Sequence, residues 1–265
     1  MAILQQTANG DVLASARLIL PPGSLGSGLI GWWYPGGSEE QTLRNLAYAA
    51  FGDTQENSLV GSPTINPASI SVSAANYMQT DVGDIQAGIT IGLAAKLTTT
   101  VTGGSTGVAL ISCYGTDAAQ GNASVGCGIT CFLAGTSSGT KLQGFATFNN
   151  ISAPTGVQPT ADDQDLNSAY FLALLTVDGT TSPGPVKILN ATSGASQFVN
   201  GTLPRLAQQT RKFSIGLRPS SPTLTGHADI AWCGIWNRLM TDPDEISSLQ
   251  TVVRAAMAAR GLTLP

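Results

Sequence analysis

The stretch that decides the fold is Ala228–Ile246, which reads ADIAWCGIWNRLMTDPDEI. Its first half, up to Trp236, is apolar at almost every position. Successive residues of a strand point to opposite faces, so this half has two apolar faces. The two faces are Ile230, Trp232 and Gly234, and Ala231, Cys233 and Ile235. The pattern therefore predicts a central strand that is covered on both sides.

The second half of the stretch predicts the start of a helix. Asp242 is a favoured N-cap residue, Pro243 suits the first helical position, and Glu245 completes a capping box with Asp242. Apolar residues then recur at helical spacing, at Ile246, Leu249, Val253, Ala256 and Met257. Gly261 is a natural C′ residue. We therefore expect a helix over residues 243–260, packed on the strands.

Arg238 lies in the turn between the predicted strand and the predicted helix. A guanidinium group carries five N–H donors in a rigid fork, which suits several acceptors at once. We therefore expect Arg238 to anchor this turn by donating hydrogen bonds to backbone carbonyls.

Working outward from this stretch, further strands alternate with turns rich in Gly, Pro, Ser and Asp. The predicted strands are 70–74, 89–97, 108–114, 126–133, 141–149, 169–177, 186–190, 212–217 and 227–236. Many short strands at this spacing favour an all-β sandwich or barrel. A shorter helix is expected within residues 38–50. The segment PPGSLGSG, residues 21–28, separates an N-terminal arm, residues 1–22, from a single body, residues 23–265.

The composition excludes several classes of protein. Charged residues are 11% of the 265 residues, and 12 Lys and Arg against 16 Asp and Glu cannot make a strong phosphate-binding face, so no nucleic-acid partner is expected. A hydrophobic fraction of 42% with a net charge of −4 is not that of a disordered chain. No apolar run approaches the roughly 20 residues of a membrane span, so no membrane insertion is expected. The N-terminal residues do not resemble a signal peptide, which favours synthesis in the cytoplasm.

Two parts of the chain resemble a known family. They are 28–35 (GLIGWWYP), 59–63 and 76–80 near the start, and 228–246 and 253–262 near the end. Together they resemble the concanavalin A-like, laminin-G-like jelly roll of bacteriophage virion and tail proteins, over about residues 28–262. In that family an early strand containing Trp pairs with a late strand like 228–236. The resemblance implies an all-β, antiparallel two-sheet jelly-roll sandwich with a C-terminal α-helix.

The resemblance also implies a function. It implies a non-enzymatic virion structural protein, a tail fibre or tail-associated protein, that binds host-surface polysaccharide without cleaving it. Such a protein is located in the phage tail and contacts other virion tail proteins. Phage fibres are commonly trimeric, and the low charge leaves uncharged surface for burial between subunits, so a homotrimer is expected. Two alternatives stay open: a polysaccharide depolymerase (a glycoside hydrolase) of a phage tail, and a lectin-like module of a cellular protein.

Carboxylates are the groups on which catalysis would depend. Glycosidases of this fold use a strand pattern like Glu-x-Asp-x-Glu, which holds an acid and a nucleophile about 5 Å apart. The four glutamates, Glu39, Glu40, Glu56 and Glu245, do not form this pattern, so we expect no catalytic pair. The densest acidic cluster is Asp162, Asp163 and Asp165. We interpret it as a solvated loop, with weakly bound calcium as the alternative and no other cofactor.

Carbohydrate sites combine exposed aromatic rings with amide and carboxylate groups. Trp33, Tyr34 and Tyr114 lie at the ends of apolar segments beside Gly-rich loops, and Asn149 could add a polar contact. These four residues are the candidates for sugar binding. Each of them also fits a purely structural role.

The cysteines and the histidine offer little chemistry. Cys113, Cys127, Cys131 and Cys233 lack the paired spacing of a zinc site, so we interpret them as buried free thiols. The single histidine, His227, would share a strand face with Asp229, where the two could pair as in a catalytic triad. Without a nucleophile motif, we interpret His227 as a residue at the edge of a strand.

Overall fold

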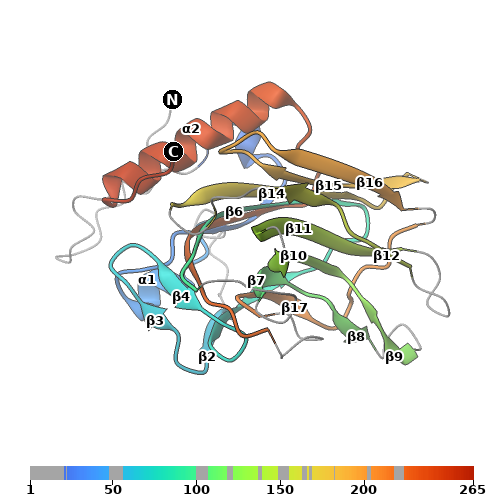
Figure 1. The fold of residues 1–265 in the computed structure, drawn as a ribbon, viewed down its shortest axis with the longest axis horizontal. Helices are drawn as coiled ribbons and strands as arrows, with labels where there is room; N and C mark the ends of the chain where they lie inside the picture. The colour runs from blue at the N-terminus through green and yellow to red at the C-terminus, as the bar shows by residue number, and fades with distance from the viewer. Residues whose placement is uncertain are drawn as a thin grey trace.

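The computed structural model forms three layers, with two facing antiparallel β-sheets and a long C-terminal helix on the outer face of one of them (Figure 1). It describes residues 21, 23–47, 56–99, 107–117, 122–136, 139–148, 155–162, 166, 169–181, 183–201, 204–217 and 224–265. The predicted all-β, two-sheet antiparallel sandwich with a C-terminal helix is confirmed. Of the predicted N-terminal arm, residues 1–22, only residue 21 lies within the described residues.

The first sheet, sheet A, is built around β18 (Ala228–Trp236). This strand pairs with β6 on one side and with both β1 and β4 on the other, which confirms the predicted central strand. Its pairing with β1, where Trp33 faces Cys233, also confirms the expected early partner. The strands in order are β16 (Ser196–Gly201), β15 (Gly184–Asn190), β14 (Phe171–Asp178), β6 (Gly88–Leu97), β18, β4 (Ile70–Val72) and β3 (Thr64–Ile65). The eighth strand, β1 (Leu29–Trp33), pairs with the C-terminal half of β18.

The second sheet, sheet B, also has eight strands. In order they are β12 (Thr155–Val157), β11 (Gly139–Phe148), β10 (Ile129–Thr136), β7 (Val108–Ser112), β17 (Lys212–Ile215), β5 (Tyr77–Gly83) and β2 (Ser58–Val60), and β13 (Thr160–Asp162) also pairs with β11. A separate hairpin joins β8 (Gly115–Asp117) to β9 (Asn122–Cys127). Eight of the nine predicted strands are present with shifted ends, whereas the predicted strand 126–133 is divided at Gly128 between β9 and β10. Short or polar strands such as β16 were not predicted.

The predicted alternation along β18 is wrong in its second half. The pairing of β18 with β6 shifts register between Ile230 and Trp232, which marks a β-bulge. A bulge adds one residue to one strand and so exchanges the two faces beyond it. As a result Ile230 and Cys233 both lie in the core between the sheets, whereas Trp232 lies on the helix side.

Two hydrophobic cores result from this arrangement. The larger core lies between the sheets and takes residues such as Ile91, Leu175 and Ile215. The smaller core lies between sheet A and α2 (Pro243–Ala259), and its centre is a cluster of indole rings. The ring of Trp32 lies edge-on to Trp232, with centroids 4.9 Å apart, and edge-on to Trp236 at 5.9 Å. Edge-to-face pairs of this kind add to the stabilisation from burial.

The helix α2 is confirmed, with one correction at its N-terminus. Asp242 caps it by accepting from the backbone N–H of Asp244. Glu245 does not complete a capping box, because its carboxylate pairs instead with the guanidinium of Arg238. Arg238 also donates to the carbonyls of Ser27 at 2.7 Å and Ser24 at 3.0 Å, which confirms its predicted role in the turn.

The C-terminus of α2 ends as the sequence predicts. Gly261 has φ of +75°, a conformation that favours glycine. The N–H of Leu262 donates to the carbonyl of Met257 at 3.0 Å, and that of Gly261 to Ala258 at 3.1 Å. These two bonds make a Schellman motif.

The short helix expected within residues 38–50 is α1 (Glu39–Leu43), capped by Ser38, and residues 48–50 lie outside the described residues. Where the chain is described, none of the helices has the length and apolar character needed to cross a membrane.

Candidate functional site

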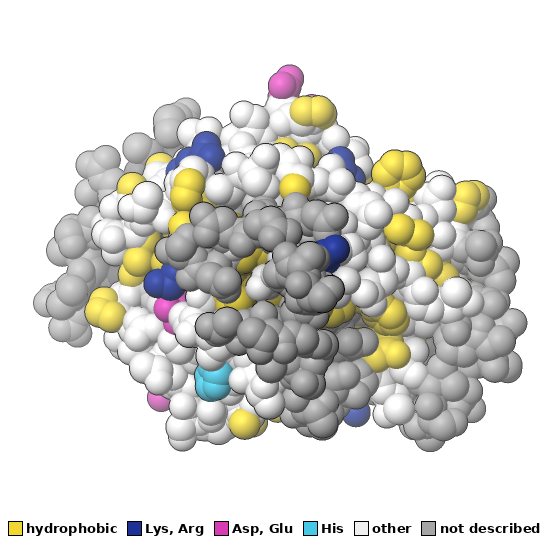
Figure 2. Space-filling model, in the orientation of Figure 1, with side chains coloured by type: hydrophobic (Ala, Val, Ile, Leu, Met, Phe, Trp, Pro, Cys, Tyr) yellow, Lys and Arg dark blue, Asp and Glu magenta, His cyan; other side chains and the backbone are white. Residues whose placement is uncertain are grey.

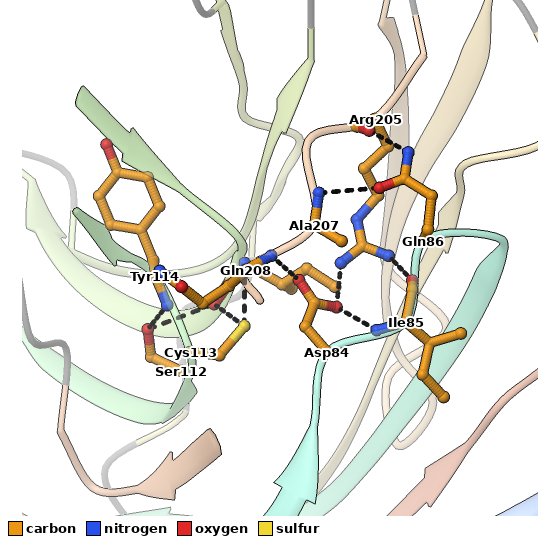
Figure 3. A network of polar contacts seen from close by, with 10 residues as sticks. Asp84, Ile85, Gln86, Ser112, Cys113, Tyr114, Arg205, Ala207 and Gln208 are labelled. Atoms are coloured by element: carbon orange, nitrogen blue, oxygen red, sulfur yellow. Dashed lines mark hydrogen bonds and ion pairs between the residues drawn. The ribbon is translucent and has the colours of Figure 1, made fainter. Parts of the chain in front are cut away.

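A polar cleft of about 460 Å³ opens beside the end of β5. One wall is the segment that connects β5 to β6, and the other is the segment that leads into β17 (Figure 3). Its lining residues are Gly83, Asp84, Gln86, Ala207, Gln208, Gln209, Arg211 and Lys212. Polar groups dominate this lining, so the cleft suits a hydrophilic ligand.

The base of the cleft is a buried ion pair between Asp84 and Arg205, whose side chains are both 0% exposed. The guanidinium of Arg205 also donates to the carbonyl of Ile85. The carboxylate of Asp84 further accepts from the N–H groups of Ile85 at 2.8 Å and Gln208 at 2.9 Å (Figure 3). Charge neutralisation and hydrogen bonds together make burial of this pair tolerable.

The amide of Gln86 joins the two walls. Its Nε2 donates to the carbonyl of Arg205, and its Oε1 accepts from the N–H of Ala207 at 3.1 Å. Both ends of this side chain are therefore used in holding the backbone of residues 205–207.

The amide of Gln208 attaches the same segment to the β8–β9 hairpin. Its Nε2 donates to the carbonyl of Gly115 at 3.0 Å, while its Oε1 accepts from the N–H and the hydroxyl of Thr210. Nearby, the thiol of Cys113 accepts from the N–H of Ile129 at 3.4 Å. The cleft thus has a rigid, hydrogen-bonded base.

Two cations lie at the exposed rim of the cleft. Arg211 donates from Nε to the carbonyl of Thr116 at 3.5 Å. Lys212 begins β17 and lies near Asp81 on the neighbouring strand β5. Burial raises the pKa of Asp81, and the charge of Lys212 lowers it in part. Both cations are exposed, and neither forms an ion pair with another described residue.

The structure does not bring the predicted sugar-binding residues together. Trp33 is fully buried between the sheets, and Tyr34 is buried against α2, where burial raises its pKa. The expected exposure of these two rings is therefore wrong, because the bulk of each ring fills a core. Tyr114 is partly exposed and lies edge-on to Phe145 at 4.9 Å, and Figure 3 shows it pointing away from the ion pair. Asn149 lies outside the described residues.

The acidic cluster falls mostly outside the structure's described part. The backbone of Asp162 is the end of β13 and pairs with Lys141, whereas Asp163 and Asp165 lie outside the described residues. Among the residues with described side chains, no group of three or more His, Cys, Asp or Glu is arranged to hold a metal ion. The calcium site at this cluster remains a prediction.

The cysteines are buried and free, as the sequence predicts. Burial raises the pKa of Cys131 to about 12. His227 is exposed beside the start of β18, and Figure 2 shows the single histidine at the surface. The carboxylate of Asp229 accepts from the hydroxyl of Ser71, not from the imidazole.

Sequence reasoning missed the cleft because its residues carry no motif. The signal that could have found it is the run AQQTRK, residues 207–212, in which two amides and two adjacent cations interrupt a chain that is poor in charge. Figure 2 shows how sparse charged side chains are on one face of the molecule. Only the fold brings residues 83–86 against this run.

Comparison with solved structures gives a consistent likeness of fold, although no family model and no curated protein sequence matches the chain. The receptor-binding domain of botulinum neurotoxin type G matches 86% of this chain with a TM-score of 0.60 and 12% identity. The ligand-binding domain of serotype D, solved in complex with N-acetylneuraminic acid, matches 87% with a TM-score of 0.60 and 11% identity. A type C neurotoxin structure, described as dependent on two ganglioside molecules for cell entry, matches 86% with a TM-score of 0.58 and 11% identity.

The matched region covers only 52% or 53% of each of these three structures, so the chain spans about half their length. At these identities the likeness shows a shared sandwich fold and nothing about the ligand.

Proposed function

We propose that the protein is a non-enzymatic carbohydrate-binding β-sandwich. The observation that carries this proposal is the polar cleft, whose base is fixed by buried hydrogen bonds while its rim presents exposed donors. A saccharide needs such preorganised polar groups, because its hydroxyls are well solvated before binding. Structures with this fold are described with gangliosides and with N-acetylneuraminic acid, so a sandwich of this kind can carry a carbohydrate site.

The biological setting of the proposal is a bacteriophage tail. It rests on the sequence resemblance alone: the early Trp strand, the late strand and the helix that follows it. In this setting the protein is a homotrimeric tail fibre or tail-associated component of the virion and contacts host-surface polysaccharide. An antiserum against the purified protein tests the setting: it should label the tails of phage particles in electron micrographs. Labelling of uninfected cells alone would favour the lectin-like module of a cellular protein.

The absence of catalysis is part of the proposal. The carboxylate that lines the cleft, Asp84, is bound to Arg205 and to two backbone N–H groups. These contacts use both oxygens of the Asp84 side chain, whereas a glycosidase acid must present one of them to the leaving group. The geometry of this residue therefore favours binding over cleavage.

A glycoside hydrolase is the second candidate, and one observation favours it. Burial raises the pKa of Asp81, the charge of Glu56 adds to this rise, and the Oδ1 atom of Asp81 is buried without a hydrogen-bond partner. A raised pKa is what a catalytic acid needs. Release of reducing ends from host capsule that is lost in Asp81→Asn, but kept in the exposed control Asp244→Asn, would establish this candidate.

The experiment for the main proposal is a glycan array probed with the purified full-length chain, followed by a reducing-end assay on each glycan that binds. We expect binding without release. Binding with release of reducing ends would contradict the non-enzymatic function. Failure to bind any neutral or acidic glycan would contradict carbohydrate binding itself.

A further inference from the structure

We propose that the cleft selects acidic saccharides, and that Arg211 and Lys212 bind the anionic group of the sugar. This inference rests on the proposed function and adds the chemical class of the ligand. It depends on which polar groups of the cleft are already used within the protein and which remain for a ligand.

Three of the polar side chains that line the cleft are used internally. Asp84 accepts from Arg205, Ile85 and Gln208. The amide of Gln86 is bonded at both ends to the backbone of residues 205–207. The amide of Gln208 is bonded at both ends as well. A ligand that used these groups would first have to break hydrogen bonds within the protein that are buried or partly buried, which is costly.

Arg211 and Lys212 carry donors that form no hydrogen bond within the described part of the protein. Arg211 is exposed and uses only its Nε in a described hydrogen bond, so its two terminal amino groups have no partner among the described residues. The ammonium of Lys212 makes no hydrogen bond to a described residue. The paired donors of a guanidinium match the two oxygens of a carboxylate, and an adjacent ammonium adds a second charge. The unused donors of Arg211 and Lys212 therefore suit an oxyanion better than a neutral hydroxyl.

A glycine lies directly against one of the two cations, Arg211. A Cβ atom added to Gly115 would lie 2.8 Å from Nε of Arg211, so this side chain packs directly against the glycine backbone. A Cβ atom added to Gly83 would lie 3.5 Å from Nζ of Lys212, which is ordinary contact. Because Gly115 has no side chain, Arg211 can lie against its backbone. This contact limits the conformational freedom of the guanidinium before a ligand binds.

The charges around the cleft limit where an anion can bind. The negative charge of Asp84 is neutralised by Arg205 beneath the cleft, whereas Asp81 lies near Lys212 and the charge of Glu56 acts on Asp81. The protein as a whole carries a net charge of −4, so the field of the whole molecule does not attract anions. Recognition of an acidic sugar therefore depends on these two cations at short range.

The test measures the affinity of the full-length chain for sialyllactose and digalacturonate against neutral lactose, with inorganic phosphate as a separate probe. We expect the acidic sugars to bind at least about tenfold more tightly than lactose, the effect of one charge-assisted hydrogen bond. The double variant Arg211→Gln/Lys212→Gln should lose this preference. Lys187→Gln, a control for loss of a cation on sheet A, should keep it.

A second pair of variants tests the seating of Arg211 without removing any charge. Gly115→Ala should displace the guanidinium and weaken binding of the acidic sugars, whereas Gly26→Ala, at a glycine that does not line the cleft, should leave it near the wild-type value. Circular dichroism and thermal melting establish that all the variants fold. A Gly115→Ala variant that is folded and binds like the wild type would overturn the role of Arg211.

The outcomes separate this inference from the proposed function. Equal binding of lactose and sialyllactose would support a carbohydrate site and overturn the selection of acidic sugars. Retained preference in the double variant would overturn the assignment to these two cations. If inorganic phosphate bound as tightly as the acidic sugars, the assignment of a saccharide as the ligand would be overturned, and the cleft would be a site for anions in general. Absence of binding to all glycans would overturn the proposed function as well.

Discussion

Arg205 and Asp84 illustrate how one pair of residues can determine the shape of a surface. Both side chains are completely buried, and their bonds to Ile85 and Gln208 hold the two walls of the cleft together. A buried ion pair adds little net stability compared with apolar residues of the same size, but removing one partner leaves an unpaired charge. The value of this pair therefore lies in fixing the conformation of the walls.

Arg205→Met should lower the free energy of unfolding by about 3–5 kcal/mol, because Asp84 is left buried without its counter-ion. The double variant Arg205→Met/Asp84→Leu should lose less than Arg205→Met alone, since it buries no charge. Urea unfolding of the wild type, both single variants and the double variant measures this coupling. Additive losses would contradict the importance of the pair.

Asp178 should make stability depend on pH. Its side chain is buried at the end of β14, and although burial opposes its charge, hydrogen bonds from Thr180 and Thr181 lower its pKa overall. A carboxyl with a lowered pKa stabilises the folded state above its unfolded value of about 4. This stabilisation is lost as the pH falls through the lower folded value. Urea midpoints between pH 7 and pH 3 should therefore fall more steeply for the wild type than for Asp178→Asn.

The four thiols should be unreactive in the folded protein. All are buried, and burial raises the pKa of Cys131 to about 12 and also raises that of Cys113 and Cys233. Because the thiolate is the reactive form, Ellman's reagent at pH 8 should modify no cysteine until denaturant is added. Rapid modification of one thiol in the native state would show that its surroundings open readily.

At the scale of elements, β18 shows what a sequence pattern can and cannot predict. Its apolar run predicted a central strand, and Asp242 and Gly261 predicted both ends of the helix, because these signals are local. The faces of the strand were mispredicted since the bulge at Ile230–Trp232 depends on pairing with β6. Register and bulges are properties of two strands, so one strand's sequence does not determine them.

Two glycines make room for the indole cluster on sheet A. Gly234 of β18 pairs with Gly92 of β6, and the ring of Trp232 lies over both. A Cβ atom on Gly234 would lie 2.7 Å from atoms of both Trp232 and Trp236. Gly234→Ala should therefore lower stability by about 1–3 kcal/mol through overpacking.

The matched control is Gly26→Ala, where the added Cβ would make only an ordinary contact of 3.7 Å with a backbone oxygen. Thermal melting of both variants checks the prediction. Equal melting temperatures for the two variants would show that the cluster rearranges without cost.

At the scale of the whole molecule, the sandwich was predictable and the cleft was not. The fold depends on the distribution of apolar segments along the chain, which the sequence displays directly. The cleft depends on Asp84 meeting Arg205, two residues far apart in the chain, and on two cations that resemble any solvated surface pair. Trp33 and Tyr34 were wrong candidates for an exposed sugar site, because a sequence does not distinguish a ring that stacks on a ligand from one that fills a core.

The prediction of a homotrimer also belongs to this scale. With 11% charged residues, the chain has an uncharged surface of the kind that subunit interfaces bury. Among the described residues, Phe198 on the edge strand β16 is the most exposed large hydrophobic side chain, at 63%. Light scattering of the full-length protein at micromolar concentration should give the mass of a trimer. A monomer at this concentration would contradict the prediction.

The placement of the tryptophans has a practical consequence for spectroscopy. All four indoles are completely buried, three of them under α2 and Trp33 between the sheets, and none lines the cleft. Intrinsic emission should thus respond strongly when the helix detaches and hardly at all when a ligand enters the cleft. A ligand can therefore saturate the cleft without changing the tryptophan fluorescence. A reporter indole introduced at the rim, as in Gln209→Trp, would make occupancy visible.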